Sequence, residues 1–529
     1  MTRFHDMLGG FCGCFAKSPG TANPSAGHDA DSTEASPNPQ QQQWHSEVPE
    51  PPPTEIKNRL EHCLENHACG PRSDAVLPSR VLDVGEANGT NIQLVQTHTG
   101  TIKTGQFVAL SYCWGAHPPF VTTPGTLEAR MQGFDVRMMP QTLRDAVHIT
   151  RSLGFRYLWI DALCILQGDS AEAVRDWEVE SAQMEQIYGN AVITIVAAWA
   201  SHCNGGIIRP PRPERLGGES STRREFRSEP INSRAWALQE WLLSSRVATF
   251  TSTGAAYFHC SSPRDGEPPA HFGHKIYRFR FPLPPKEPSP LNWIHILGNY
   301  TSRNLTNARD KLPAMAGLVR RYDSLTGFKN GRYLAGLWEA SLLGELLWRR
   351  DDLFVAFFNP PQPSKTRTGQ APSWSWASVN GIIAQTTYFA TGRMPPYVAE
   401  VVSCEVVHAT ADPYSMVSSG KLIIRGPAKP LPADSIRVDD SGTPRLYDGT
   451  LNVGAIYLDL EDEVAIARSR QARALSCLLV CTRAYHHGLL LQQVGESPDM
   501  YERVGLVVSS GNEEVAWWGD TEHQTFTIV

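Results

Sequence analysis

The sequence predicts an α/β protein built on a parallel β-sheet, with helical additions and a β-rich subdomain at its C-terminal end. Between residues 107 and 260, short runs that are almost continuously apolar alternate with helical patterns. This alternation is typical of a parallel sheet that is covered on both faces. Between residues 310 and 350 apolar side chains recur at helical spacing, and after about residue 395 short β-type runs prevail.

The length of the chain indicates several domains, because 529 residues exceed what one hydrophobic core usually supports. Residues 18–55 are rich in Pro, Ser, Gln and Asp, and such a segment buries too little apolar surface to offset the entropy lost on ordering. We expect a disordered N-terminal segment (1–55), a helix and hairpin (56–106), the main α/β domain (107–260), a mostly helical extension with a Pro-rich connector (261–394) and the β-rich subdomain (395–529).

Charge and hydropathy exclude several classes of protein. A net charge of −6 argues against a nucleic-acid binder, which would carry a basic face. The longest apolar runs are too short to cross a bilayer, and residues 1–17 lack the apolar core of a signal peptide. The eleven cysteines are scattered and fit reduced thiols, so we expect a cytoplasmic protein without a transmembrane segment. Cys12 and Cys14 allow lipidation, but we favour a disordered leader.

Five largely apolar runs are expected to be strands. Residues 81–84 and 92–95 flank a turn at Asn88-Gly89 and predict a hairpin that leads into the main domain. The buried strands of that domain are expected at 107–112, 157–160 and 191–198.

Helical patterns separate these strands. Thr142, followed by Asp145, is expected to cap a helix that stops at Gly154. A second helix is expected to present the side chains Trp177, Ser181, Met184 and Tyr188 on one face and to stop at Gly189. Further along, helical spacing is shown by Leu312, Met315, Leu318 and Val319, and again by Leu334, Leu337, Trp338 and Leu342.

Familiar catalytic signatures such as Walker, dinucleotide-binding, zincin and hydrolase motifs are absent from the sequence. Topology nevertheless points to a candidate site, because ligands of parallel sheets bind beyond the carboxyl ends of the strands. Ser111 and Asp161 stand at two such ends and should approach one crevice. The Asp161 carboxylate could bind a hydroxyl, a cation or a ribose, or it could only cap the turn that follows.

Glu240 is the second candidate. It follows Trp236 by four residues, so on a helix the two side chains share a face. An apolar ring beside a carboxyl group tends to raise its pKa, which suits acid–base work or the stabilisation of a developing cation. The alternative is that Trp236 is a core residue and that Glu240 pairs with Arg234 or Arg246.

A metal site is not expected. Cys63, His67 and Cys69, with His62 adjacent, carry zinc-binding atoms, but no second ligand pair follows nearby at a typical spacing. We therefore interpret this stretch as a helix with incidental Cys and His.

Five motifs in order resemble the heterokaryon incompatibility (HET) domain of fungal proteins. They are FVALSYCWG at 107–115, PQTLRDA at 140–146, LGFRYLWIDALCILQ at 153–167, MEQIYGNA at 184–191 with Gly205-Gly206, and RAWALQE at 234–240 with Leu242-Leu243-Ser244. Weaker downstream likenesses are Asp310-Lys311 and SWSWAS at 373–378.

The resemblance implies fungal nonself recognition, in which the activated domain kills the fused cell. HET domains are also distantly similar to Toll/interleukin-1 receptor (TIR) domains, which implies a TIR-like or flavodoxin-like core. In TIR enzymes a glutamate four residues after a tryptophan supports NAD cleavage. Trp236 and Glu240 match that pattern, although Ala237 replaces the cysteine usual after the tryptophan.

Carried over in this way, Glu240 is the candidate catalytic residue. Ser111, Trp114, Asp161 and Trp236 are candidate ligand-binding residues, with NAD as a possible substrate and no cofactor. Three functions stay open: a cell-death effector that acts by assembly with protein partners or with itself, an NAD-cleaving enzyme, and an orphan HET protein that regulates a neighbouring biosynthetic gene cluster.

Overall fold

The computed structural model describes residues 54–529 apart from several gaps. The gaps are 72–74, 87, 99, 101, 117–119, 210–227, 263–289, 328, 351–364, 386–395, 433, 463–464, 467–473, 483–484, 496 and 498. Three predicted features lie almost wholly outside the described residues. They are the disordered leader with Cys12 and Cys14, the Pro-rich connector at 282–290, and an exposed insertion that the charges, Pro and Gly of residues 209–230 predict.

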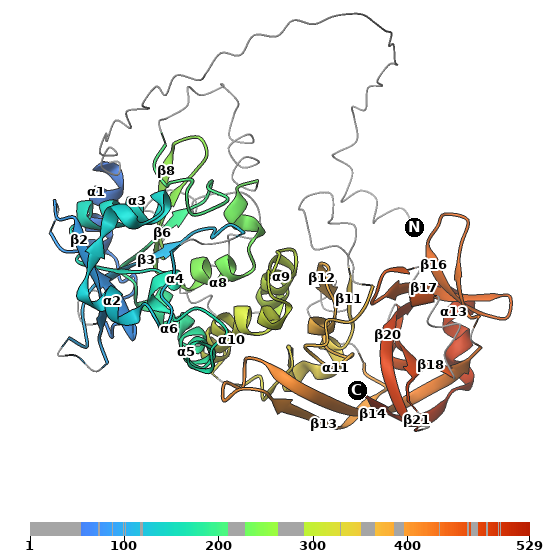
Figure 1. The fold of residues 1–529 in the computed structure, drawn as a ribbon. Helices are drawn as coiled ribbons and strands as arrows, with labels where there is room; N and C mark the ends of the chain where they lie inside the picture. The colour runs from blue at the N-terminus through green and yellow to red at the C-terminus, as the bar shows by residue number, and fades with distance from the viewer. Residues whose placement is uncertain are drawn as a thin grey trace, which may run out of the picture. The chain divides into compact units, whose positions relative to one another are not determined.

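An eight-stranded sheet forms the centre of the first half (Figure 1). Its order is β4 (Phe134–Asp135), β2 (Asn91–Gln96), β1 (Arg80–Asp83), β5 (Tyr157–Trp159), β3 (Phe107–Ser111), β6 (Ile193–Ala197), β7 (Arg246–Phe250) and β8 (Ala256–Cys260). The four strands β5, β3, β6 and β7 run parallel. Apolar runs predicted β5, β3 and β6, whereas β7 was not predicted. The predicted hairpin at 81–84 and 92–95 forms β1–β2. This hairpin and β4 on one side, and β8 on the other, add antiparallel strands to the parallel centre.

Helices α3, α6 and α8 pack against the central strands β5 and β3. The helices among the described residues of this half are α1 (Thr54–Asn66), α2 (Leu127–Gln132), α3 (Gln141–Ser152), α4 (Asp161–Cys164), α5 (Ala171–Ala182), α6 (Met184–Asn190) and α8 (Trp236–Leu243), with 3-10 turns η1 (Val136–Met138) and η2 (Pro230–Ser233). The predicted single helix ending at Gly189 is in fact two, α5 and α6, with a break at Gln183, and Gly189 lies inside α6.

The predicted cap at Thr142 is also wrong. Helix α3 begins at Gln141, with Pro140 in the cap position, so Thr142 lies within the first turn of the helix. The Thr142 hydroxyl instead accepts the backbone N–H of Gly206, and Asp145 Oδ2 accepts that of Ile207 at 2.7 Å. These two polar residues therefore anchor a loop from a distant part of the chain.

The middle segment, residues 290–385 between the two large sheets in the sequence, is less helical than the spacing of its apolar residues predicted. It contains α9 (Pro290–Thr301), η3 (Ala308–Lys311), α10 (Pro313–Leu325), β9 (Tyr333–Leu334), β10 (Leu337–Trp338), η4 (Glu339–Ser341), α11 (Leu342–Glu345), β11 (Trp348–Arg350), η6 (Trp376–Ser378) and β12 (Ile383–Gln385). The predicted helix through Leu334 and Trp338 is wrong, because β9 and β10 form a hairpin. Its two turn residues, Ala335 and Gly336, both have positive φ, as a tight hairpin turn requires.

The β-rich C-terminal region is confirmed as a nine-stranded sheet. Its elements are β13 (Glu400–His408), β14 (Val417–Leu431), β15 (Ile436–Val438), β16 (Pro444–Asp448), β17 (Leu451–Leu458), β18 (Leu475–Thr482), β19 (His486–Gln493), β20 (Met500–Ser509), α13 (Asn512–Ala516), η7 (Trp517–Asp520) and β21 (Glu522–Ile528). Because β21 pairs with both β14 and β20, the strands β14, β18, β19, β20 and β21 form a closed circuit.

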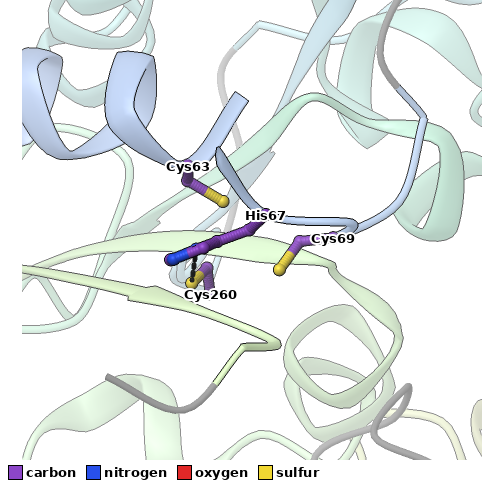
Figure 2. A group of neighbouring side chains, drawn as sticks. All are labelled: Cys63, His67, Cys69 and Cys260. Atoms are coloured by element: carbon purple, nitrogen blue, oxygen red, sulfur yellow. Dashed lines mark hydrogen bonds between the residues drawn. The ribbon is translucent and has the colours of Figure 1, made fainter. Parts of the chain in front are cut away.

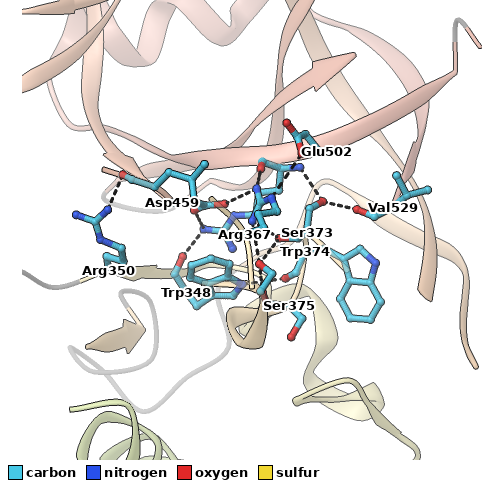
Figure 3. A network of polar contacts seen from close by, with 12 residues as sticks. Trp348, Arg350, Arg367, Ser373, Trp374, Ser375, Asp459, Glu502 and Val529 are labelled. Carbon is cyan, nitrogen blue, oxygen red and sulfur yellow. Dashed lines mark hydrogen bonds and ion pairs between the residues drawn. The ribbon is translucent and has the colours of Figure 1, made fainter. Parts of the chain in front are cut away.

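A buried polar network ties the SWSWAS segment at 373–378 to this sheet (Figure 3). The Ser373 hydroxyl accepts a hydrogen bond from the backbone N–H of Arg503 at 3.0 Å. The backbone N–H of Ser373 donates to the Val529 carbonyl. The fully buried Arg503 guanidinium donates to the Trp348 carbonyl and lies 3.3 Å from Asp459. The SWSWAS segment therefore has a structural role, because it connects the middle segment to the nine-stranded sheet.

No helix among the described residues is both long and apolar enough to cross a membrane.

Candidate functional site

The carboxyl ends of β3 and β5 bring the first two candidate residues to one edge of the sheet. The strands pair in parallel, with Phe107 opposite Tyr157 and Ala109 opposite Trp159. Ser111 closes β3, and Asp161 opens α4 directly after β5. Both residues thus stand at the edge where ligands of parallel sheets bind.

Glu240 reaches the same edge from helix α8, which packs against β3. The Ser111 hydroxyl donates a hydrogen bond to Glu240 Oε2, although 129 positions separate the two residues. The Ser111 side chain is 1% exposed and that of Glu240 2%. The serine and the carboxyl group therefore form one buried polar pair.

Burial raises the pKa of Glu240 to about 7, because a carboxylate loses its hydration inside the protein. The positive charge of Arg234 opposes this rise, whereas the negative charge of Asp161 adds to it. The hydrogen bond from Ser111 favours the ionised form. The carboxyl group is thus balanced to exchange protons near neutral pH.

Asp161 accepts hydrogen bonds from a side chain and from the backbone. Its Oδ2 accepts the indole N–H of Trp114 at 2.9 Å, and its Oδ1 accepts the backbone N–H of Ala162 at 2.7 Å. The local bond from Ala162 agrees with the interpretation that Asp161 caps the turn after β5. The bond from Trp114 goes beyond it, because Trp114 lies in the loop after β3. Burial raises the pKa of Asp161, and the nearby Arg234 charge lowers it.

Arg234 supplies the positive charge beside the carboxyl groups of Glu240 and Asp161. The sequence had suggested it only as a possible ion-pair partner of Glu240. Its guanidinium donates to the backbone carbonyl of Tyr112, next to Ser111. Its own carbonyl accepts from Arg303 at 3.2 Å. Arg234 is the first residue of the RAWALQE motif, and that position was the signal that could have identified it.

Arg246, the other partner considered for Glu240, lies elsewhere. It is fully buried, and its guanidinium donates to Cys63 Sγ and to the Val192 carbonyl, both at 3.2 Å.

The described contacts of the Trp236 side chain are with Asp310 and Trp177 rather than with Glu240. Its indole N–H donates to Asp310 Oδ2 at 2.9 Å, and its ring meets Trp177 edge-on with centroids 6.3 Å apart. The adjacent Lys311 is buried and donates to the Val379 carbonyl and to Asn380 Oδ1. Burial lowers the pKa of Lys311 to about 7. Asp310-Lys311 thus links α8 to the segment that follows SWSWAS.

Cys63, His67 and Cys69 are joined by Cys260, which sequence reasoning missed (Figure 2). One ligand atom from each of the four side chains lies within 4.8 Å of every other. The sequence-based expectation that no metal-ligand set exists did not consider Cys260, because its position on β8 is remote in sequence.

Comparison with protein families gives one match. Residues 107–240 match the family model described as "Heterokaryon incompatibility protein (HET)". The matched stretch runs from the first residue of β3 to Glu240 and includes Ser111, Trp114, Asp161 and Arg234. Searches among curated proteins and among solved structures returned no match.

Proposed function

Because this chain is a heterokaryon incompatibility (HET) domain protein, we propose that it acts in fungal nonself recognition and that its HET domain triggers cell death by hydrolysing NAD. The observation that carries the enzymatic part is the buried Glu240 carboxyl group, whose pKa is raised to about 7 and which accepts a hydrogen bond from Ser111. The sequence likeness of Trp236 and Glu240 to the TIR pattern supports the choice of substrate.

The reaction breaks the bond between ribose C1′ and the nicotinamide nitrogen, and the electron pair leaves with nicotinamide. Positive charge then develops on the ribose, as in glycoside hydrolysis, where a carboxylate stabilises the oxocarbenium-like transition state. Ionised Glu240 fills this role. Water adds to C1′, and its proton passes to Glu240 and then to solvent, so that ADP-ribose, nicotinamide and one proton are released.

Asp161 and Ser111 would hold the ribose. Asp161 is partly exposed, and carboxylates at strand ends commonly accept ribose hydroxyl groups. The bond from Trp114 fixes the direction of the Asp161 carboxylate before substrate arrives. Such preorganisation lowers the cost of binding.

The second candidate is assembly without turnover, and one observation favours it. With 1% and 2% of their surfaces exposed, Ser111 and Glu240 lie below the molecular surface. In this candidate their hydrogen bond only fastens α8 to the sheet, and the response arises from contact with protein partners or with further copies of the chain.

The deciding experiment compares the full chain with Glu240→Gln after forced clustering, with released nicotinamide measured by chromatography. We expect the variant to lose about a hundredfold or more of the activity, as acid–base and charge-stabilising groups commonly contribute. Glu345→Gln is the matched control. Glu345 is another buried carboxyl group with its pKa raised to about 7, but it lies on α11 outside the HET match.

Expression of the same variants in fungal cells separates the two candidates. Loss of both toxicity and NAD consumption in Glu240→Gln supports the enzyme. Toxicity that persists in folded Glu240→Gln, with NAD intact, would overturn it and leave assembly.

A further inference from the structure

Three ligand-type side chains come from one short stretch at the end of α1. Cys63 lies in the last turn of α1, and His67 follows the helix, with its N–H donating to the Cys63 carbonyl at 3.0 Å. This helical spacing of four residues places the two side chains on one face. Cys69 follows two residues later, and Gly70 turns the chain with φ of +74°.

The turn at Gly70 has no room for a side chain. A Cβ at this position would lie 2.3 Å from Ser245 Oγ. The backbone after Cys69 is therefore pressed against the start of β7, which holds Cys69 close to the sheet.

The fourth side chain arrives from the sheet. Cys260 ends β8, which α1 packs against, and its sulfur lies 3.4 Å from His67 Nδ1 although 193 positions separate them. Figure 2 shows the four side chains turned toward one another from α1, the loop after it and the end of β8.

We propose that Cys63, His67, Cys69 and Cys260 bind one Zn²⁺ ion as a closed structural site. Three thiolates and one imidazole form a ligand set that zinc takes in tetrahedral geometry. With metal–ligand bonds of about 2.0–2.3 Å, the ligand atoms would lie ~3.3–3.8 Å apart. The largest separation of 4.8 Å therefore closes by only about 1 Å when the ion binds.

The surroundings suit the charge of such a site. Zinc with three thiolates carries a net charge of −1, which is costly to bury without compensation. The fully buried Arg246 guanidinium donates to Cys63 Sγ at 3.2 Å and supplies the opposite charge. The backbone N–H of Ser262 donates to Cys69 Sγ at 3.1 Å. Donors of this kind orient ligands from outside the first coordination sphere.

The ion would link α1 to β8, the edge strand of the eight-stranded sheet. All four protein ligands leave no open position, so the site is structural and independent of the Glu240 chemistry.

The test is the zinc content of the full chain, purified without chelators and measured by plasma mass spectrometry. We expect about one zinc per chain in the wild type and at least a tenfold lower content in Cys260→Ser and Cys69→Ser. Cys404→Ser is the matched control, because Cys404 is buried in β13, outside the cluster, and should leave the zinc content unchanged.

Two further measurements keep the proposal falsifiable if a variant fails to fold. The wild type loaded with Co²⁺ should show the strong visible bands of tetrahedral thiolate ligation. His67→Cys should retain the metal with a shifted spectrum, whereas His67→Ala should lose it. A wild type that neither retains zinc nor shows these bands, a folded Cys260→Ser with full zinc content, or a native disulfide within the cluster would each overturn the proposal.

Discussion

The hydroxyl of Ser111 at the end of β3 donates a hydrogen bond to Glu240 on α8, and this contact joins the first and last motifs of the HET match. Only folding makes the two residues neighbours, because α8 packs against β3. The bond stabilises the ionised carboxylate against the effect of burial. It therefore gives the site a pH dependence that can be tested.

Ser111→Ala and Asp161→Asn should move the pH midpoint of NAD hydrolysis in opposite directions. Ser111→Ala removes a donor to the carboxylate, a bond worth roughly 1.5–3 kcal/mol, so the pKa of Glu240 and the midpoint should rise. Asp161→Asn removes a neighbouring negative charge, so both should fall. The midpoint is read from initial rates between pH 5 and 9, whatever the loss in absolute rate. Shifts in the same direction would contradict this assignment of Glu240.

Glu240→Gln should change how stability depends on pH. Between its ordinary value of 4.5 and about 7, Glu240 holds a proton in the folded state that the unfolded chain releases. The free energy of unfolding that Glu240 contributes is therefore fully present below pH 4.5 and is lost as pH rises through 7. The loss is ~3 kcal/mol at 1.36 kcal/mol per pKa unit.

Urea unfolding of wild type and Glu240→Gln at pH 5 and pH 8 measures this effect. The variant should gain stability relative to the wild type as pH rises. Glu345 titrates in the same window in both proteins, so its contribution cancels from the difference. A difference that stays constant with pH would show that Glu240 has an ordinary pKa.

Trp236→Phe should weaken the link between α8 and the segment around Asp310. The substitution keeps an aromatic ring beside Trp177 but removes the N–H that Asp310 accepts. Loss of a bond to this partly buried carboxyl group should cost about 1–3 kcal/mol in chemical unfolding. Combined with Asp310→Ala, the double-mutant cycle should give a coupling energy of at least ~0.5 kcal/mol. Additive effects of the two changes would place the role of Trp236 in packing alone.

The apolar runs at 107–112, 157–160 and 191–198 predicted β3, β5 and β6, because a strand buried on both faces is mostly apolar on both of them. The same kind of local reasoning failed at Thr142 and at Leu334. A cap-forming hydroxyl can equally accept an N–H from a distant loop, as Thr142 does from Gly206. Apolar residues at helical spacing can equally line a hairpin, as Leu334 and Trp338 do.

At the candidate site, strand ends indicated Ser111 and Asp161, and the motif spacing indicated Glu240. The contacts of the Arg234 guanidinium and the direction of the Trp236 side chain could not be predicted, because both depend on other segments, at Tyr112 and Asp310.

The amino-acid sequence alone determined the α/β class, the HET motifs and the carboxyl groups at issue, since these depend on local periodicity and residue type. Tertiary structure alone decided that Ser111 bonds Glu240 and that Cys260 meets Cys63, His67 and Cys69. Local preferences act over a few residues, whereas these contacts span 129 and 193 positions. Which residues meet across such distances is set by the register of the sheet and the packing of α1 and α8 against it.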